Sequence, residues 1–381
     1  MEKRDNRPRV LITGKAYDPH IGGIETVMQQ TAEYMRRYAK TKVLCCRDDR
    51  GFTKKDKIRR VPVTYAGSFG TVASCPISFS YFSEFRRKVM LADVVELHLP
   101  FPLADLALLL SGYKGRVVVA WHSDVVRQKL ILKFYKPLMK WLLRRADTII
   151  VATKNHIESS PYLRPYREKC VVIPYGIAPD DYENRPHLQP LQSALTDPNA
   201  KKILFTGRLV YYKGADVLLR AFAKINANAE LFLAGGGVLE DQLRADAAAL
   251  GIAEKVHFLG RRMTPELRDM FADCDLFVLP SVANSEAFGI VQLEAMVNGK
   301  PVINTDLPTG VPLVSLHAKT GLTVPPADAD ALAAAMEKLI CDDQLREQYG
   351  NAARERVLQE FALDTVMRKT RDTLLQNVRT R

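Results

Sequence analysis

The side chains in this sequence best suited to chemistry are two glutamates, Glu286 and Glu294, which stand eight positions apart. Segment 280–296 predicts the end of a buried strand, a loop, and an apolar helix that Gly289 opens. The two carboxylates then lie up to about 12 Å apart, beyond the roughly 5–9.5 Å of glycosidase pairs. The spacing favours two separate contacts to one extended ligand. The alternative is an ordinary loop carboxylate and a surface helix residue.

Two cations form a second group. Arg208 and Lys213 lie five positions apart between Gly207 and Gly214, directly after a predicted strand at 202–206. Fixed cations at this position can hold a diphosphate and stabilise the charge that it gains as a leaving group. A solvated basic loop is the alternative.

Glycines follow several predicted strands. Gly22 and Gly23 come after the first one and permit close approach of the backbone to a phosphate at a helix start. Gly235, in a run of three glycines, lets the backbone pass close to a base or a ribose. Neither segment is a complete dinucleotide-binding fingerprint.

The elements that must position these residues alternate between strand and helix. Short apolar runs predict strands at 10–13, 42–45, 94–98, 117–122, 148–152 and 171–174, and again at 202–206, 230–234, 256–259, 276–280 and 301–305. Continuous apolar strands separated by helices indicate parallel sheets covered on both faces. We therefore expect an α/β protein of two Rossmann-like domains that face each other across a cleft.

The domain boundaries follow from the same pattern. We expect a first Rossmann-like domain at 1–175, a proline-rich linker or hinge at 176–200, and a second Rossmann-like domain at 201–360. Residues 361–381 predict a final helix that packs near the first domain, because Phe361, Val366, Met367 and Leu374 recur at roughly helical spacing.

In this order, the motifs resemble the retaining glycosyltransferases of family 4, which have the GT-B fold. The resemblance covers nearly the whole chain and includes the Gly22-Gly23 loop, Thr206-Gly-Arg208 with Lys213-Gly214, the glycines at 235–237, and the Glu286 to Glu294 segment. It implies a metal-independent transferase, without a cofactor, whose substrate is a nucleotide diphosphate sugar. Residues 1–175 would form the acceptor-binding domain, and residues 201–360 the nucleotide-sugar-binding domain. Transfer would be a front-face displacement in which a donor phosphate oxygen accepts the acceptor's proton.

The resemblance also implies residue roles. Arg208 and Lys213 would bind the donor diphosphate, Glu286 the sugar hydroxyls, and Glu294 the ribose. Backbone N–H groups near Phe288, Gly289 and Ile290 would meet sugar and phosphates, with Gly22 and Gly23 closing over them. Arg261 and Arg262 would lie beside the base, and His122 near the reacting sugar, where a structural histidine is the alternative. The expected catalytic set is Glu286, His122, Arg208 and Lys213.

One segment departs from the family. Many relatives carry a Pro-Glu pair where this chain has Asp306-Leu-Pro-Thr-Gly-Val-Pro-Leu313. This variant resembles bacterial mannosyl- and rhamnosyltransferases of surface polysaccharide or lipopolysaccharide synthesis. It favours GDP-mannose as the donor, with UDP-sugars next, and a glycan or lipid-linked glycan as the acceptor. Asp273-Cys-Asp275 lacks the context of a metal-binding Asp-x-Asp motif, and we expect a structural role for it.

The basic charge is concentrated at the start of the chain. Residues 1–150 carry 28 Lys and Arg against 14 Asp and Glu, whereas the remaining 231 carry 27 against 29. A helical face carries Lys129, Lys133, Lys136, Lys140 and Arg144 beside Trp141, although Pro137 would interrupt or kink that helix. This face suits an anionic inner membrane, and the alternative is a core helix with a solvated lysine face.

Bulk properties restrict the remaining classes. The six cysteines have no metal or disulfide spacing, and no apolar run is long enough to cross a bilayer. We therefore expect a cytoplasmic protein, with a peripheral position on the cytoplasmic membrane face as one form of it. No nucleic-acid-binding module is recognisable. A sugar-nucleotide epimerase and a non-catalytic nucleotide-sugar-binding protein remain as alternatives. Linkage and oligomeric state stay open.

Overall fold

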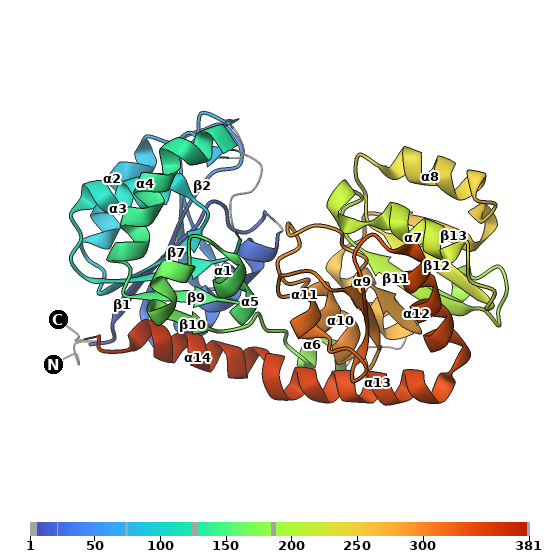
Figure 1. Cartoon of the computed structure of the whole chain (residues 1–381). Coiled ribbons are helices and arrows are strands. Elements are labelled where there is room, and N and C mark those ends of the chain that lie inside the picture. The colour runs from blue at the N-terminus through green and yellow to red at the C-terminus, as the bar shows by residue number, and fades with distance from the viewer. Residues whose placement is uncertain (1–5, 21, 73–74, 124–128, 184–187, 379–381) are drawn as a thin grey trace. The chain divides into compact units, whose positions relative to one another are not determined.

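The computed structural model describes residues 6–20, 22–72, 75–123, 129–183 and 188–378. Backbone contacts divide the chain into two compact units (Figure 1). Unit 1 contains Met1–Tyr175 and Val366–Arg381, and unit 2 contains Gly176–Thr365. Each unit is built on its own parallel sheet, which confirms the predicted fold class of two Rossmann-like domains.

Unit 1 contains an eight-stranded sheet in the order β10-β9-β8-β7-β1-β2-β4-β3. All neighbouring strands are parallel except β3, which is antiparallel to β4. The strands are β1 (Arg9–Thr13), β2 (Lys40–Cys46), β3 (Lys54–Ile58), β4 (Val61–Ala66), β7 (Val94–Leu99), β8 (Arg116–Trp121), β9 (Thr148–Val151) and β10 (Cys170–Val172). A separate hairpin joins β5 (Thr71–Val72) to β6 (Cys75–Pro76).

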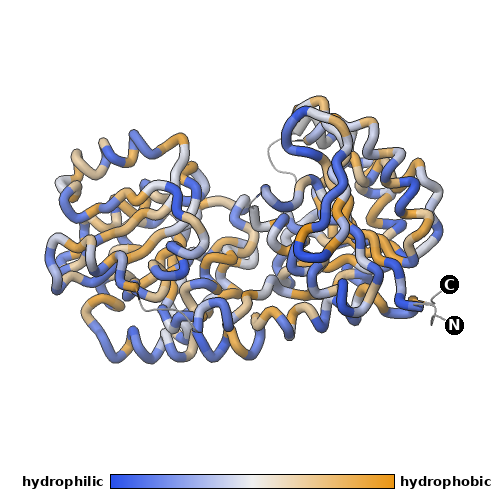
Figure 2. Tube along the Cα trace, turned by 180° about the vertical axis from the view of Figure 1, so that it is seen from behind, coloured by the Kyte–Doolittle hydropathy of each residue, from blue (hydrophilic) through white to orange (hydrophobic). Residues whose placement is uncertain are grey.

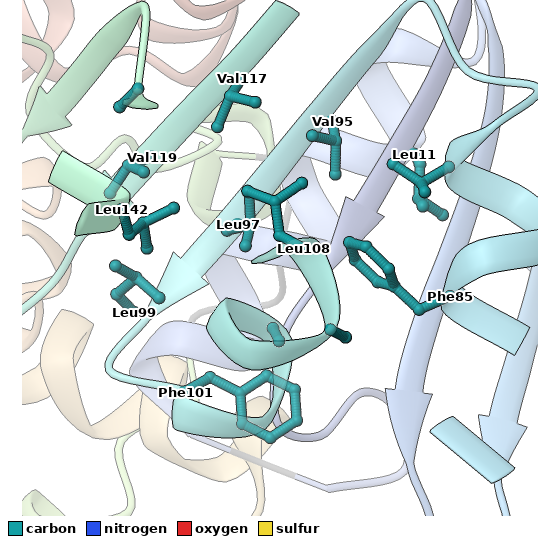
Figure 3. Packing of buried hydrophobic residues seen from close by; sticks show 14 of the residues in the cluster. Leu11, Phe85, Val95, Leu97, Leu99, Phe101, Leu108, Val117, Val119 and Leu142 are labelled. Atoms are coloured by element: carbon teal, nitrogen blue, oxygen red, sulfur yellow. The ribbon is translucent and has the colours of Figure 1, made fainter. Parts of the chain in front are cut away.

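Helices cover both faces of this sheet. One face packs against α2 (Ser80–Val89), α3 (Pro102–Ser111) and α4 (Lys129–Arg145), through the cluster around Leu97, Phe85 and Leu142 (Figure 3). The other face packs against α1 (Gly23–Met35), and Leu374 of α14 (Leu363–Leu375) joins that cluster. A short α5 (Lys154–Ser159) follows β9.

Unit 2 contains a six-stranded, fully parallel sheet in the order β13-β12-β11-β14-β15-β16. Its strands are β11 (Lys201–Thr206), β12 (Ala229–Ala234), β13 (Val256–Gly260), β14 (Leu276–Val278), β15 (Val302–Thr305) and β16 (Gly321–Val324). Its helices are α6 (Asp180–Glu183), α7 (Ala215–Phe222), α8 (Glu240–Ala249), α9 (Thr264–Asp273), α10 (Val291–Val297), α11 (Val311–Val314), α12 (Ala329–Cys341) and α13 (Asp343–Arg356). In both units the strands coincide with hydrophobic stretches of the trace, and hydrophilic residues lie along the outer sides of the helices (Figure 2).

Every strand expected from the sequence is present, but β3, β4, the short β5 and β6, and β16 were not expected. β3 has no apolar run, because it is an exposed edge strand of sequence Lys-Lys-Asp-Lys-Ile. β16 has only four residues and also lies at a sheet edge.

Two local expectations were wrong. The helix after Glu286 begins at Val291, two residues later than Gly289. Helix α4 continues through Pro137 without interruption, since that proline is exposed and water can solvate the carbonyl that loses its hydrogen bond.

Residues 176–183 and 188–200, from the segment for which the sequence predicts a linker, belong to unit 2. Leu191 is buried, and its N–H donates to Asp273 Oδ2 at 2.7 Å. The final helix completes unit 1 from Val366 onward, with Val366, Met367 and Leu374 buried.

The return of the last helix to unit 1 makes a testable prediction. Because Leu374 is fully buried against the first sheet, we expect Leu374→Ala to lower the free energy of unfolding of unit 1 by about 3 kcal/mol. Both tryptophans, Trp121 and Trp141, belong to unit 1, so tryptophan fluorescence during urea unfolding reports on this unit alone. Leu358→Ala, at a 41% exposed side chain of unit 2, is the control. An equal loss in both variants would contradict the docking of the helix.

Candidate functional site

Glycine-rich loops pack closely at the carboxyl ends of β11, β12 and β13. A Cβ at Gly235 would lie 1.8 Å from the carbonyl oxygen of Gly207, so no other residue fits there. The N–H of Gly207 donates to Ala234 at 3.0 Å, and that of Gly235 donates to Gly260 at 2.8 Å. The backbone after β11 therefore lies directly on the backbone after β12.

A second close contact joins this loop to the segment after β14. Gly214 has a φ of 68°, and a Cβ there would lie 2.1 Å from the carbonyl oxygen of Pro280. The Val282 N–H also donates to the Tyr212 carbonyl at 2.9 Å. We call the loop after β11, with Arg208 and Lys213, the cation loop, and the loop after β14, with Glu286, the glutamate loop. The two loops lie about 70 positions apart in sequence, and these contacts join them into one surface.

The two predicted cations project from this surface in different environments. Arg208 is exposed, and its guanidinium donates to the Tyr212 hydroxyl at 2.9 Å. Lys213 is 11% exposed, and its Nζ lies 5.7 Å from the Tyr212 ring centroid. Tyr212 thus lies between the two cations and orients both of them.

Lys213 forms an ion pair with Glu286. Its Nζ lies 2.5 Å from Glu286 Oε2, and the glutamate side chain is 12% exposed. The buried hydroxyl of Ser281 donates to the same oxygen at 3.3 Å. The carbonyl of Ser281 accepts from Thr305 at 2.6 Å, which connects the glutamate loop to β15. The structure therefore brings together three of the expected catalytic residues, Arg208, Lys213 and Glu286.

Glu294 has a different partner. Its Oε1 accepts a hydrogen bond of 3.0 Å from the hydroxyl of Tyr182, which lies on α6. Arg268 lies 5.1 Å from the Tyr182 ring centroid and pairs with Asp181. Burial raises the pKa of Glu294 to about 7, while the Tyr182 hydrogen bond and the charge of Arg268 act in the opposite direction.

The backbone between the two glutamates offers hydrogen-bond donors. Within the described part of the chain, the N–H groups of Gly289 and Ile290 donate to no other group. Phe288 is buried, with its ring 6.2 Å from that of Phe361. The amides of Gly289 and Ile290 can therefore donate to a ligand, and contact of this segment with a sugar or a phosphate stays a prediction.

Hydrogen bonds from buried amide groups hold segment 306–313 in place. Asn304 donates to Gln292 Oε1 at 2.8 Å and to the carbonyl of Val311 at 3.0 Å. The Gly310 N–H donates to the carbonyl of Ala287 at 2.8 Å, beside Glu286. Residues 306–313 therefore support the glutamate loop directly.

Arg261 and Arg262 directly follow β13. A Cβ at Gly236 would lie 3.4 Å from Arg261 Cγ, so the Arg261 stem lies beside the glycine loop. Arg262 pairs with Glu266 at 3.4 Å. Their contact with a nucleotide base stays a prediction.

The Asp273-Cys-Asp275 segment has structural contacts. Asp273 Oδ1 pairs with Lys202 at 3.0 Å, and its Oδ2 accepts from the N–H groups of Leu191 and Gln192. Asp275 accepts from the N–H of Lys202 at 2.8 Å. The two carboxylates therefore link this segment to β11 and, through Asp273, to the segment around Leu191 in unit 2.

In unit 1, His122 lies at the end of β8 in a chain of buried polar groups. Its Nε2 is 2.9 Å from His98 Nδ1, and its Nδ1 is 2.7 Å from the Tyr175 hydroxyl. Burial, followed by the neighbouring His98 and His156, holds the pKa of His122 well below its usual value, so the ring is neutral at pH 7. Both ring nitrogens therefore contact other side chains, and a role for His122 near a sugar stays a prediction.

The other expected sites of unit 1 are at two helices. Gly22 precedes α1 and Gly23 opens it, as expected for a loop that follows β1. On α4 the side chains of Lys133, Lys136, Lys140 and Arg144 are exposed, and Trp141 packs partly against the core. The side chain of Lys129 lies outside the described residues. This arrangement agrees with a core helix that has a solvated lysine face, and membrane contact stays a prediction.

Comparison with known proteins identifies the family. The model described as Glycosyltransferase Family 4 matches residues 21–181, and that described as Glycosyl transferases group 1 matches residues 191–356. The chain belongs to glycosyltransferase family 4. This glycosyltransferase is 39% identical over 290 residues to D-rhamnosyltransferase WbpZ of Pseudomonas aeruginosa, covering 76% of this chain and 75% of that protein.

One further relative and two solved structures match this glycosyltransferase over nearly its full length. It is 32% identical to O-antigen chain mannosyltransferase C of Escherichia coli, with 93% of this chain and 95% of the relative covered. Anabaena Alr3699/HepE, solved in complex with UDP and glucose, has a TM-score of 0.78 at 20% identity, over 96% of this chain and 99% of that one. WaaG, a glycosyltransferase of lipopolysaccharide biosynthesis, has a TM-score of 0.68 at 20% identity, over 97% and 100%. These two structures share the fold.

The sequence analysis did not identify three residues that contact the expected site residues. Tyr182, Tyr212 and Ser281 contact Glu294, Arg208 and Glu286 respectively. Tyr212 lies inside the cation motif and could have been noted there. Tyr182 is 112 positions from its partner, in a segment without periodicity, so no local pattern indicates it.

The raised pKa of Glu294 predicts a dependence of stability on pH. Because the folded carboxyl holds its proton up to about pH 7 and the unfolded one only to about 4.5, the unfolded state ionises first as pH rises. Relative to Glu294→Gln, the unfolding free energy of the wild type should fall between these values, by up to about 3 kcal/mol, and then level off. Urea unfolding followed by circular dichroism measures it, with the exposed Glu347→Gln as control. If the unfolding free energies of wild type and Glu294→Gln changed with pH in parallel, that result would contradict a pKa of Glu294 raised by burial.

Proposed function

We propose that the protein is a retaining hexosyltransferase that transfers a mannose-type sugar from a nucleotide diphosphate sugar to a glycan or lipid-linked glycan. The observation that carries the proposal is the joined surface of unit 2, where Arg208, Lys213 and Glu286 meet at the carboxyl ends of the strands. In open α/β sheets, ligands bind at this edge. The relatives named for rhamnosyl and mannosyl transfer support a role in bacterial surface polysaccharide or lipopolysaccharide synthesis.

The two cations suit a diphosphate leaving group. Arg208 is exposed and reaches a ligand without rearrangement, whereas Lys213 is held in place by Glu286 and beside Tyr212. As the bond between the anomeric carbon and the phosphate breaks, charge develops on the diphosphate, and these cations stabilise it. We propose that they perform this role without a metal ion or cofactor.

In this proposal Glu286 orients the sugar. One of its oxygens accepts from Lys213 and Ser281, so the carboxylate retains acceptor capacity for sugar hydroxyls. The acceptor hydroxyl attacks the anomeric carbon on the face from which the diphosphate leaves. A phosphate oxygen of the donor takes the proton of that hydroxyl, and the new bond keeps the original configuration.

Glu294 and the free N–H groups suit the rest of the donor. The Gly289 and Ile290 amides would donate to phosphate or sugar oxygens, and Glu294 would accept from the ribose hydroxyls in place of Tyr182. Arg261 and Arg262 would lie beside the base. GDP-mannose is the favoured donor and UDP-sugars come next, because the named relatives act on mannose-type sugars. No helix among the described residues is long and apolar enough to cross a bilayer; we propose a cytoplasmic site of action.

A donor screen tests the site in unit 2. With EDTA present, we expect one nucleotide sugar, GDP-mannose first, to raise the melting temperature of the wild type, because a ligand that binds only the folded state stabilises it. Arg208→Ala should remove this shift, and Arg220→Ala, at another exposed arginine of unit 2, should retain it. A shift that EDTA abolishes would refute the metal-free site, and a shift retained in Arg208→Ala would refute the role of that cation.

A second variant separates sugar orientation from diphosphate binding. Glu286→Gln should slow sugar transfer by about 100-fold, the scale expected when one positioned polar group is lost from a transition state. Its affinity for the nucleoside diphosphate alone should change little, since Lys213 remains and can still donate to the amide oxygen of the glutamine. Transfer rates and nucleotide titrations measure the two effects, with Glu347→Gln as control. An unchanged transfer rate would contradict the assignment.

A further inference from the structure

Two fully buried amide side chains meet beside the glutamate loop, Gln292 on α10 and Asn304 on β15. Asn304 Nδ2 donates to Gln292 Oε1 at 2.8 Å, and the Thr323 hydroxyl donates to Asn304 Oδ1 at 2.8 Å. Gln292 Nε2 donates to the carbonyls of Phe288 at 3.0 Å and Val311 at 3.2 Å. The reverse orientation would place the Gln292 oxygen against two carbonyls, so these partners fix which end is the nitrogen. We call Gln292 and Asn304 the amide pair.

The side chain of Gln292 determines how the peptide between Phe288 and Gly289 is turned. The carbonyl of this peptide accepts the hydrogen bond from Gln292 Nε2, and a Cβ at Gly289 would lie 2.9 Å from that nitrogen. In a trans peptide the carbonyl and the N–H point in opposite directions, and both cis bonds of the described residues precede prolines. The Gly289 N–H therefore points away from the amide pair.

The backbone of Gln292 holds the next peptide in the same way. Its N–H donates to the carbonyl of Gly289 at 2.9 Å, so the Ile290 N–H points to the opposite side of that peptide. The N–H groups of Gly289 and Ile290, which lack a partner within the described residues, are therefore those opposite the two carbonyls that Gln292 binds. Gly289 is buried, and buried N–H groups without a partner are rare, so we expect a ligand to accept from it.

The amide pair also connects this loop to residues 306–313. The carbonyl of Val311 accepts from both amides, and the Gly310 N–H donates to the carbonyl of Ala287. Rotation of the Phe288–Gly289 peptide would leave a buried N–H of Gln292 without its acceptor, which is unfavourable. The pair therefore opposes that rotation before any ligand binds.

We propose that Gln292, held by Asn304, is a positioning residue that directs the Gly289 and Ile290 N–H groups to the diphosphate of the bound nucleotide sugar. This role rests on the proposed function, because unit 2 must bind the donor for it. A diphosphate needs such donors, since Lys213 shares its charge with a carboxylate. With the Phe288–Gly289 peptide turned round, a carbonyl oxygen would face the phosphate and repel it.

The first experiment compares the full-length wild type with Gln292→Met, which keeps the length of the side chain and removes its amide. GDP and GMP, with UDP and UMP in parallel, are titrated by calorimetry, beside GDP-mannose and UDP-glucose. Leu339→Ala, at a fully buried leucine of α12, is the control, because it destabilises unit 2 without removing any of these hydrogen bonds. Circular dichroism verifies folding, and the calorimetric stoichiometry gives the fraction of protein that binds.

We expect Gln292→Met to weaken binding of the nucleoside diphosphate by about tenfold and that of the monophosphate by less than about twofold, the scale of a lost hydrogen bond to a charged group. Leu339→Ala should lower the melting temperature and keep both affinities. Equal weakening of both nucleotides, or none, would overturn the positioning role. A loss confined to the nucleotide sugar would place the N–H groups at the sugar and overturn the diphosphate assignment. If the wild type binds neither GDP nor UDP, the donor site itself is refuted, and this role with it.

A second measurement needs no change at the amide pair, so it does not depend on the folding of Gln292→Met. With 13C at the phenylalanine carbonyls and 15N at glycine, only the pairs Phe69-Gly70 and Phe288-Gly289 give a coupled amide signal in nuclear magnetic resonance spectra. Gly70→Ala tells the two signals apart. The nucleoside diphosphate that binds should move the Gly289 proton downfield, as donation to a phosphate does, and the monophosphate should move it less. A Gly289 signal that stays unchanged when the diphosphate is bound would overturn the proposal.

Discussion

The candidate site depends on how closely two backbones can approach without side chains between them. Gly235 against Gly207, and Gly214 against Pro280, place three loops from different strands in direct contact. The polar groups on these loops, Arg208, Lys213 and Glu286, then have fixed separations before any ligand binds. Such preorganisation matters because groups already in position cost little reorganisation when charge develops on a leaving group.

The buried pair of Lys213 and Glu286 has two consequences for this arrangement. Each charge neutralises the other in a site with little access to water, so neither has to be left uncompensated before the donor arrives. The ion pair also links Lys213, which we expect to bind the diphosphate, to Glu286, which we expect to bind the sugar. It would therefore couple the two ends of a bound donor. Tyr182 has a similar relation to Glu294, in that its hydroxyl satisfies a carboxylate that a ribose would otherwise meet.

Much of the fold could be predicted because buried parallel strands appear in sequence as continuous apolar runs, and every such run proved to be a strand. Edge strands lack that pattern, and the charged β3 is the clearest case. At the site, Arg208, Lys213 and Glu286 could be predicted because each follows a strand within a recognisable motif. Tyr182 could not, since its pairing with Glu294 arises from tertiary packing of a segment that has no period. The position of His122 at the end of a strand could be predicted, but the contacts of both its ring nitrogens with His98 and Tyr175 could not.

The path of the chain has a consequence for biosynthesis. Unit 2 is continuous in sequence, whereas unit 1 needs both its first 175 residues and the segment from Val366 onward. Because a ribosome delivers the chain from its amino end, the second unit can complete its core before the first one does. Until then, the face of the first sheet that later receives Leu374 remains uncovered next to Val10 and Met35. Unit 1 precedes unit 2 in the chain and is nevertheless the later of the two to complete its fold.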